Sequence, residues 1–259
     1  MANYYFVGTR LPVLRFDASL EITFSELDTL MKDNLTNQDY AKSLLIRQYY
    51  DIQNIRAYWL KEELDPYGTM DIVQIEDALV TQIGFPDYVY NYMEKYQSKE
   101  DRIRHFSELM AVYFRQMITN TEGFLHEYLI FERDWRLVMV GLRAKKQGRD
   151  VAQELQFEDP HDLLVYQILA QKESKTFEAP PKYADLKPIF EKNQNDPLAL
   201  HLELSEYRFN KIEEMLGFDL FSIDRILGYM IQLIIVEKWQ HLSREKGIEI
   251  VDIIIKESK

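Results

Sequence analysis

Apolar residues recur about every 3.6 positions along most of this 259-residue chain, which is the spacing of one face of an α-helix. The clearest run covers residues 37–63. Its apolar positions are Ala41, Leu44, Leu45, Ile52, Ile55 and Trp59. This pattern predicts one long helix, and the turn-forming segment 65–68 ends it. Gly and Pro are scarce, at 9 and 8 residues, which also favours long helices over sheets joined by turns.

Helix-start and helix-stop signals predict the remaining elements. Thr23 with Glu26, or Ser25 with Asp28, has the spacing of a capping box at the start of a first helix. Further helices are expected over residues 71–83, 98–118, 121–147 and 197–216. Ser222 is expected to cap a last long helix, 223–246, which Gly247 ends. The isoleucine-rich tail, 248–257, is also expected to be helical, although its propensity alone would suit a strand.

These elements predict an all-α fold of long antiparallel helices in up to three helical subdomains. The expected boundaries are residues 1–96 with an irregular lead-in, 97–171 for a central subdomain, 172–195 for a linker or loop with a short helix, and 196–259 for the last subdomain. The linker is predicted from Pro180, Pro181 and Pro188. A shift of 83 residues places Asp51 on Asp134 and Ile55 on Val138, which indicates a weak internal repeat.

Composition and charge exclude several classes of function. The chain has no cysteine, which excludes disulfides, thiol catalysis and cysteine-ligated metals. Its formal net charge of −12 disfavours nonspecific binding to nucleic acid or anionic membranes. The most apolar run, residues 231–236, is too short to span a bilayer. We therefore expect a cytoplasmic protein with no nucleic-acid partner, which contacts a membrane only through other proteins.

Residues 158–162, Glu-Asp-Pro-His-Asp, are the first candidate for a metal site. The pattern also fits a helix start, with Asp159 as N-cap, Pro160 at the first helical position and Asp162 near the positive end of the helix dipole. We favour the helix start. His126-Glu127 lacks the second histidine of a zinc-protease motif, and the glycine-rich loops that bind phosphate are missing from the sequence. No catalytic, cofactor-binding or metal-binding residue is therefore expected, and the chain is not expected to be an enzyme.

A compact basic patch, formed by Arg143, Lys145, Lys146 and Arg149, follows the predicted helix 121–147. Cations in a last helical turn complement the helix dipole. The same patch can dock an acidic partner or a helix end. The two interpretations are compatible, and both are left open.

Several segments of the chain resemble one known family. Residues 132–148, which end in Leu142-Arg-Ala-Lys-Lys-Gln-Gly148, resemble a segment of the C subunit of V/A-type ATPases, which is the d subunit of the eukaryotic V-ATPase. Residues 50–56 followed by 64–68, and the opening Tyr4-Tyr5-Phe6 with Leu11-Pro12, resemble a divergent bacterial branch encoded beside V-type ATPase genes. Residues 221–229, which lead into a long helix, are similar to the last subdomain of the C subunit.

The resemblance implies a funnel-like bundle of pseudo-repeated helical subdomains without a catalytic site or cofactor. It implies a protein that links the rotor ring in the membrane to the central stalk, transmits torque during ion transport, and lies on the cytoplasmic face of the membrane as part of the complex. Asp51, Asn54, Asp134 and Arg143 are then expected to hold helix ends together within subdomains. The alternative is a stand-alone helical adaptor built from stacked helix pairs. A third class is an enzyme with an unrecognised carboxylate or histidine site.

Overall fold

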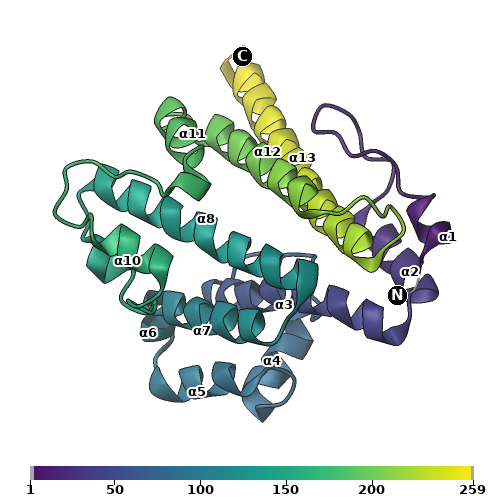
Figure 1. The fold of residues 1–259 in the computed structure, drawn as a ribbon, viewed down its shortest axis with the longest axis horizontal. Helices are drawn as coiled ribbons and strands as arrows, with labels where there is room; N and C mark the ends of the chain where they lie inside the picture. Colours follow the sequence, from purple (N-terminus) through teal and green to yellow (C-terminus); the bar gives the residue numbers. More distant parts are fainter. Residues whose placement is uncertain (1–2, 258–259) are drawn as a thin grey trace. The chain divides into compact units, whose positions relative to one another are not determined.

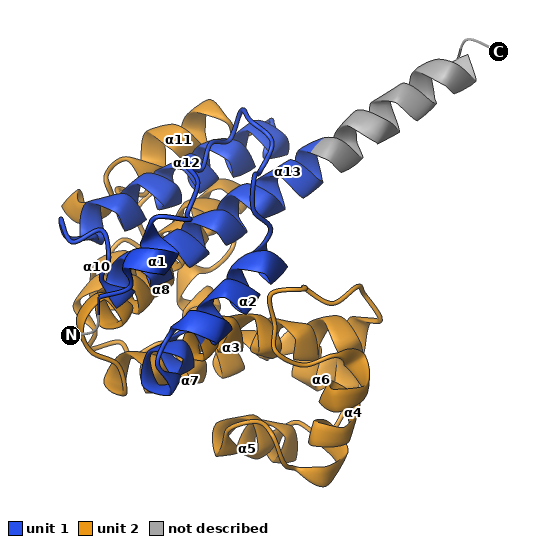
Figure 2. Cartoon of the chain, turned by 90° about the vertical axis from the view of Figure 1, so that its right-hand side faces the viewer, with its two compact units in different colours: residues 1–43, 195–259 blue, residues 44–194 orange. Residues whose placement is uncertain are grey.

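The computed structural model describes residues 3–257, and their side chains as far as residue 243. Every regular element in this range is a helix, so the predicted all-α class is confirmed (Figure 1). The chain forms two compact units, which consist of residues 1–43 with 195–259 (unit 1) and of residues 44–194 (unit 2) (Figure 2). These units differ from the predicted subdomains 1–96, 97–171, 172–195 and 196–259. The reason is that α2 (Phe24–Asn34) packs on the last helix, α13 (Ile223–Glu257), which lies far from it in sequence.

Unit 1 is built around the C-terminal helix α13 (Ile223–Glu257), which contacts α12 (Pro197–Met215) and α2 (Phe24–Asn34). The short helix α1 (Tyr5–Gly8) contacts α2. The N-terminal lead-in is joined to the other end of the chain, because the Tyr4 backbone N–H donates to the Phe221 carbonyl at 2.8 Å. The apolar run 231–236 is buried, and the one polar side chain within it, the amide of Gln232, donates to the Phe209 carbonyl.

Two of the helix boundaries predicted for unit 1 are confirmed and one is wrong. Thr23 and Glu26 form the expected capping box, in which the Glu26 backbone N–H donates to the Thr23 hydroxyl at 3.3 Å and the Thr23 N–H donates to the Glu26 carboxylate at 2.8 Å. The Ser222 hydroxyl accepts from the Arg225 N–H, as expected for a cap. Gly247 does not end α13, which continues to Glu257 and makes the tail helical as predicted. A single glycine costs a helix only about 1 kcal/mol relative to alanine.

Unit 2 is organised around α8 (Gly123–Gln147), which contacts four other helices of the unit. These are α7 (Phe106–Thr119), α9 (Val151–Glu154), α10 (Leu163–Leu169) and α11 (Leu186–Lys192). The remaining elements are most of α3 (Asn37–Leu60), α4 (Ile72–Thr81), α5 (Asp87–Lys95), α6 (Lys99–Arg104) and the 3-10 turn η1 (Pro181–Tyr183). The predicted helix stop at Gly148 is confirmed, because its φ of 66° lies in the left-handed region that favours glycine.

Unit 2 corrects three expectations. The predicted helix 98–118 is two helices, α6 and α7, which meet at His105, whose ring stacks on Tyr96 at 4.5 Å. Helix α5 is an additional element that the sequence patterns do not predict. The helix expected to start at Asp159 and Pro160 starts instead at Leu163, where Asp162 is the N-cap and accepts from the Leu164 and Val165 N–H groups.

The segment 172–195, predicted to be a linker or loop with a short helix, does contain the short helix α11, and its residues 172–194 belong to unit 2. Phe177, Tyr183 and Leu186 are buried, and the Phe177 ring would touch a Cβ added at Gly141 of α8 at 3.0 Å. Buried aromatic and aliphatic side chains hold this segment in unit 2, and Pro180 and Pro181 form the start of η1.

Candidate functional site

Two polar side chains of α3, Asp51 and Asn54, hold the loop of residues 65–70. The Asp51 carboxylate accepts from the Thr69 N–H at 2.6 Å, the Thr69 hydroxyl at 2.7 Å and the Met70 N–H at 3.2 Å. The Asn54 side-chain amide forms two hydrogen bonds with the backbone of Asp65. Its oxygen accepts from the Asp65 N–H at 2.7 Å, and its nitrogen donates to the Asp65 carbonyl at 3.0 Å. A Cβ at Gly68 would lie 2.7 Å from both Asp51 and Asn54, so the loop can approach this closely only with glycine there.

Asp51 is buried, and burial raises the pKa of its carboxyl above the ordinary value of 3.8. The hydrogen bonds from Thr69 and Met70 act in the opposite direction, because they favour the charged form. With three donors already directed at it, this carboxylate is placed to fix a loop.

Asp134, in the middle of α8, joins that helix to η1. Its carboxylate accepts from the Tyr183 hydroxyl at 2.8 Å and lies 3.4 Å from the Arg133 guanidinium. Arg133 in turn pairs with Glu158 at 3.2 Å and with Asp162, the N-cap of α10, at 3.0 Å. Burial alone would lower the pKa of Arg133, but the hydrogen bond to Asp162 and the charges of its three carboxylate partners raise it. Arg133 therefore stays charged and holds α8, α10 and the loop before α10 together.

The pH dependence of stability tests the environment of Asp134. Burial raises the pKa of this carboxyl above 3.8, against the opposing effects of Tyr183 and Arg133. A group with a raised pKa contributes stability that is complete below its unfolded pKa and is lost as pH rises through the folded pKa. We therefore expect the free energy of unfolding of the wild type to fall, relative to that of Asp134→Asn, as the pH rises from about 4 to 7.

Urea unfolding of both proteins across this pH range measures the difference directly. Asparagine keeps the size of the side chain and an oxygen that can accept from Tyr183. A difference that grows in favour of the wild type as pH rises would mean that the pair with Arg133 outweighs burial.

The pseudo-repeat predicted from the 83-residue shift is not supported by these contacts. Asp51 and Asp134 both lie buried within helices, but Asp51 binds a backbone loop and Asp134 binds side chains. The Asn54 side chain binds the backbone of a loop, whereas Leu137, which the 83-residue shift places on Asn54, is apolar and buried.

Three of the four cations of the predicted basic patch bind other groups of unit 2. Lys145 donates to the carbonyls of Lys172 and Ser174 at 2.5 and 2.7 Å, and Lys146 donates to the Gln194 carbonyl at 2.9 Å. Arg149 pairs with Glu154 at 2.7 Å. Arg143 is exposed and has no hydrogen bond or ion pair with any residue that the structure describes. Within the described residues, the patch therefore presents one free cation, Arg143, beside three that anchor neighbouring segments.

An ion pair on α8, between the buried Glu132 and the partly buried Arg136, is a further feature of unit 2 beyond the residues singled out from the sequence. Arg136 pairs with Glu132 at 2.8 Å, donates to the Tyr49 hydroxyl at 3.1 Å, and lies over the Tyr49 ring at 4.9 Å. The Trp135 indole N–H donates to the other carboxylate oxygen of Glu132 at 2.9 Å. Glutamate four residues before arginine in a long predicted helix is the spacing of a helical ion pair, so the signal is present in the sequence.

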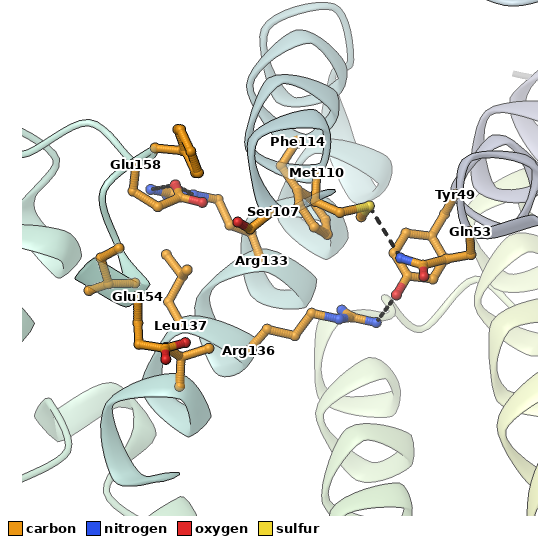
Figure 3. A pocket seen from close by; sticks show the side chains of 13 residues that line it. Tyr49, Gln53, Ser107, Met110, Phe114, Arg133, Arg136, Leu137, Glu154 and Glu158 are labelled. Atoms are coloured by element: carbon orange, nitrogen blue, oxygen red, sulfur yellow. Dashed lines mark hydrogen bonds and ion pairs between the residues drawn. The ribbon is translucent and has the colours of Figure 1, made fainter. Parts of the chain in front are cut away.

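Arg136 and Tyr49 border a cavity of about 230 Å³ within unit 2 (Figure 3). Its apolar wall comes from Phe114, Leu137, Val140, Leu155 and Phe157, and its polar rim includes Arg133, Arg136, Gln53 and Glu158. Figure 3 shows Arg136 reaching toward Tyr49, and Gln53 bonded to Met110. The charged groups of the rim are already held in ion pairs, so the cavity offers an apolar recess rather than a set of reactive groups. Among the side chains that the structure describes, no cluster of three or more metal-binding groups is found.

The described helices include none with the length and apolar character needed to cross a membrane. The molecule is thus an all-helical protein with two compact units, in which buried carboxylates and arginines fasten helices to loops. The chain belongs to the DUF2764 family, described as a protein of unknown function, whose model matches residues 1–258.

Relatives in three chlamydial species are similar over nearly their whole length, and each is described as an uncharacterized protein. The Chlamydia pneumoniae relative is 29% identical over 100% of both chains, and the Chlamydia muridarum relative is 27% identical over 99% of this chain and 98% of its own. The Chlamydia trachomatis relative is 26% identical over 99% of this chain and 98% of its own. No solved structure matches the chain.

Proposed function

We propose that this chain is a non-catalytic coupling subunit of a V/A-type rotary ATPase. It links the rotor ring to the central stalk, contacts the membrane only through partner subunits, and lies on the cytoplasmic face as part of the complex. The observation that carries the proposal is the resemblance of residues 50–56, 64–68 and 132–148 to the C subunit of these ATPases and its bacterial branch.

The local structure of these segments supports a mechanical role. Residues 50–56 and 64–68 are the helix and loop that Asp51 and Asn54 join, and residues 132–148 contain the carboxylate that joins α8 to η1. Torque passes through stiff, well-packed elements, and satisfied buried hydrogen bonds stiffen the junctions where helices meet loops. The helices α3 and α8, at 24 and 25 residues, each extend for roughly 36 Å at 1.5 Å per residue.

Affinity purification of the tagged full-length protein from its native cells tests the proposal. We expect rotor-ring and central-stalk subunits to be recovered in near-equal amounts, measured by quantitative mass spectrometry. Arg143→Glu is expected to lower that recovery several-fold, because it reverses the exposed cation of the basic patch.

The matched control is Arg104→Glu, which makes the same change at an exposed arginine of α6. It should leave recovery unchanged. Recovery of other proteins without any ATPase subunit would overturn the proposal and favour the stand-alone adaptor. Equal losses for both variants would remove the basic patch from the interface.

A further inference from the structure

Helix α4 and the residues just after it carry several large apolar side chains that are exposed to solvent. Ile72, Val73, Val80 and Ile83, the last of these just beyond the helix, are between 54% and 78% exposed. The opposite side of α4 carries the buried residues Ile75, Ala78 and Leu79. A helix that is apolar on both sides normally has a partner on each.

This face lies in the most acidic part of the chain. Residues 62–94 contain eight acidic residues and neither lysine nor arginine. The acidic residues are Glu62, Glu63, Asp65, Asp71, Glu76, Asp77, Asp87 and Glu94. Glu76 and Asp77 are exposed on α4 itself, between Val73 and Val80. The surface therefore combines exposed apolar contacts with a negative field.

We propose that the exposed face of α4 is a docking surface for a basic amphipathic helix of a partner protein. Val73 and Val80 lie two helical turns apart, about 10.5 Å along the axis, which matches the repeat of apolar positions on a facing helix. Lysine or arginine beside the partner's apolar row would meet Glu76 and Asp77. Charge complementarity of this kind directs association and selects against acidic partners.

A cleft at the N-terminal end of α4 adjoins this surface, and the two lysines that line it, Lys61 and Lys99, lie outside the acidic stretch of residues 62–94. Its volume is about 390 Å³, and it is lined by Tyr58, Trp59, Lys61, Glu62, Ile72 and Lys99. The cleft has room for a large apolar side chain of the partner beside Ile72 and the Trp59 ring. A single anchor residue in such a recess commonly supplies much of the binding energy of an interface.

The negative charge of the acidic residues on and around α4 favours some binding partners of this surface over others. Two copies of the same face would bring Glu76 and Asp77 of each chain together, so self-association is disfavoured. Phosphate-rich surfaces, such as nucleic acid or anionic lipid, are repelled by the same charges. The inference does not depend on the ATPase proposal, since a basic helix can belong to a stalk protein or to another partner.

Binding of a designed peptide to the full-length protein tests the inference. The probe is a labelled amphipathic peptide of leucine and lysine, long enough for about five helical turns. It is compared with a scrambled peptide of the same composition and with a leucine–glutamate peptide. We expect the amphipathic basic peptide to bind most tightly, and its affinity to fall between about 0.1 M and 1 M salt as screening shortens the range of the charges.

Two variants of α4 and one matched control locate the site. The double variant Val73→Ser with Val80→Ser is expected to weaken peptide binding about tenfold, and Asp77→Lys by a similar factor. Leu163→Ser with Tyr166→Ser, which changes two exposed apolar residues of α10, should leave the affinity within about twofold. These side chains are exposed, so circular dichroism should show all three proteins folded.

Several results would overturn the inference. They are equal affinity for the basic and scrambled peptides, unchanged binding by both α4 variants, or hydrogen-exchange protection that appears only outside α4 and the adjoining cleft when the peptide binds. A dimer in analytical ultracentrifugation that Val73→Ser with Val80→Ser dissolves would instead identify a second copy as the occupant. Failure of any of these tests leaves the ATPase purification result unaffected, so the two proposals fail separately.

Discussion

Arg136→Met is expected to lower the free energy of unfolding of unit 2 by about 3–5 kcal/mol, because it removes the guanidinium that pairs with the buried Glu132 carboxylate. The Glu132 side chain is 5% exposed, and the Trp135 indole that also donates to it is neutral. Removing one partner of a buried pair costs more than the pair contributes, since a charge that has lost its counterion is left out of water. The variant also loses the contacts of the guanidinium with the Tyr49 and Trp135 rings.

Urea unfolding in a Trp239→Phe background measures this loss, because the two remaining tryptophans, Trp59 and Trp135, both lie in unit 2. The control is the double variant Glu132→Gln with Arg136→Met, which removes both charges and should recover part of the stability. Arg104→Met, at an exposed pair, should cost less than about 1 kcal/mol. If the single and double variants were equally unstable, the charge of Glu132 would not be the cause.

Asp51→Ala is expected to lower the stability of unit 2 by about 2–3 kcal/mol, because hydrogen bonds to a charged group are strong and three donors lose their acceptor. The effect should be largest in the loop of residues 65–70. Native-state hydrogen exchange should show the Thr69 and Met70 amides among the most accelerated in the molecule.

Asp51→Asn provides the matched control for this loop. Asparagine keeps one carbonyl oxygen as an acceptor and has nearly the same size, so its cost should be smaller than that of alanine. Equal exchange rates at Thr69 and Met70 in the wild type and the alanine variant would show that Asp51 does not hold the loop.

Local signals in the sequence determined most of the long helices and several of their ends. The all-α class follows from the 3.6-residue spacing of apolar residues, and the ends at Thr23, Ser222 and Gly148 follow from side chains or backbone angles that act within a few residues. His105 shows the limit of such signals. The periodicity continues through it, but its stacking on Tyr96 accompanies a break between α6 and α7.

The candidate site was only half predictable for the same reason. The sequence pointed to Asp51, Asn54 and Asp134, but their partners, Thr69, Asp65 and Tyr183, lie 11 to 49 residues away and depend on how the loops fold back. The basic patch was visible as a cluster, yet only the tertiary structure separates Arg143 from the three cations that bind backbone carbonyls or Glu154.

The sequence by itself determined the helical class, the acidic balance and the local caps, because periodicity, charge and capping act between near neighbours. The tertiary structure alone decided that residues 1–43 join residues 195–259 in one unit, and that nearly all of 172–195 packs into the other. It also decided which carboxylates are buried and paired. Those outcomes depend on contacts between residues far apart in the chain, where many pairings are compatible with one pattern and packing selects among them.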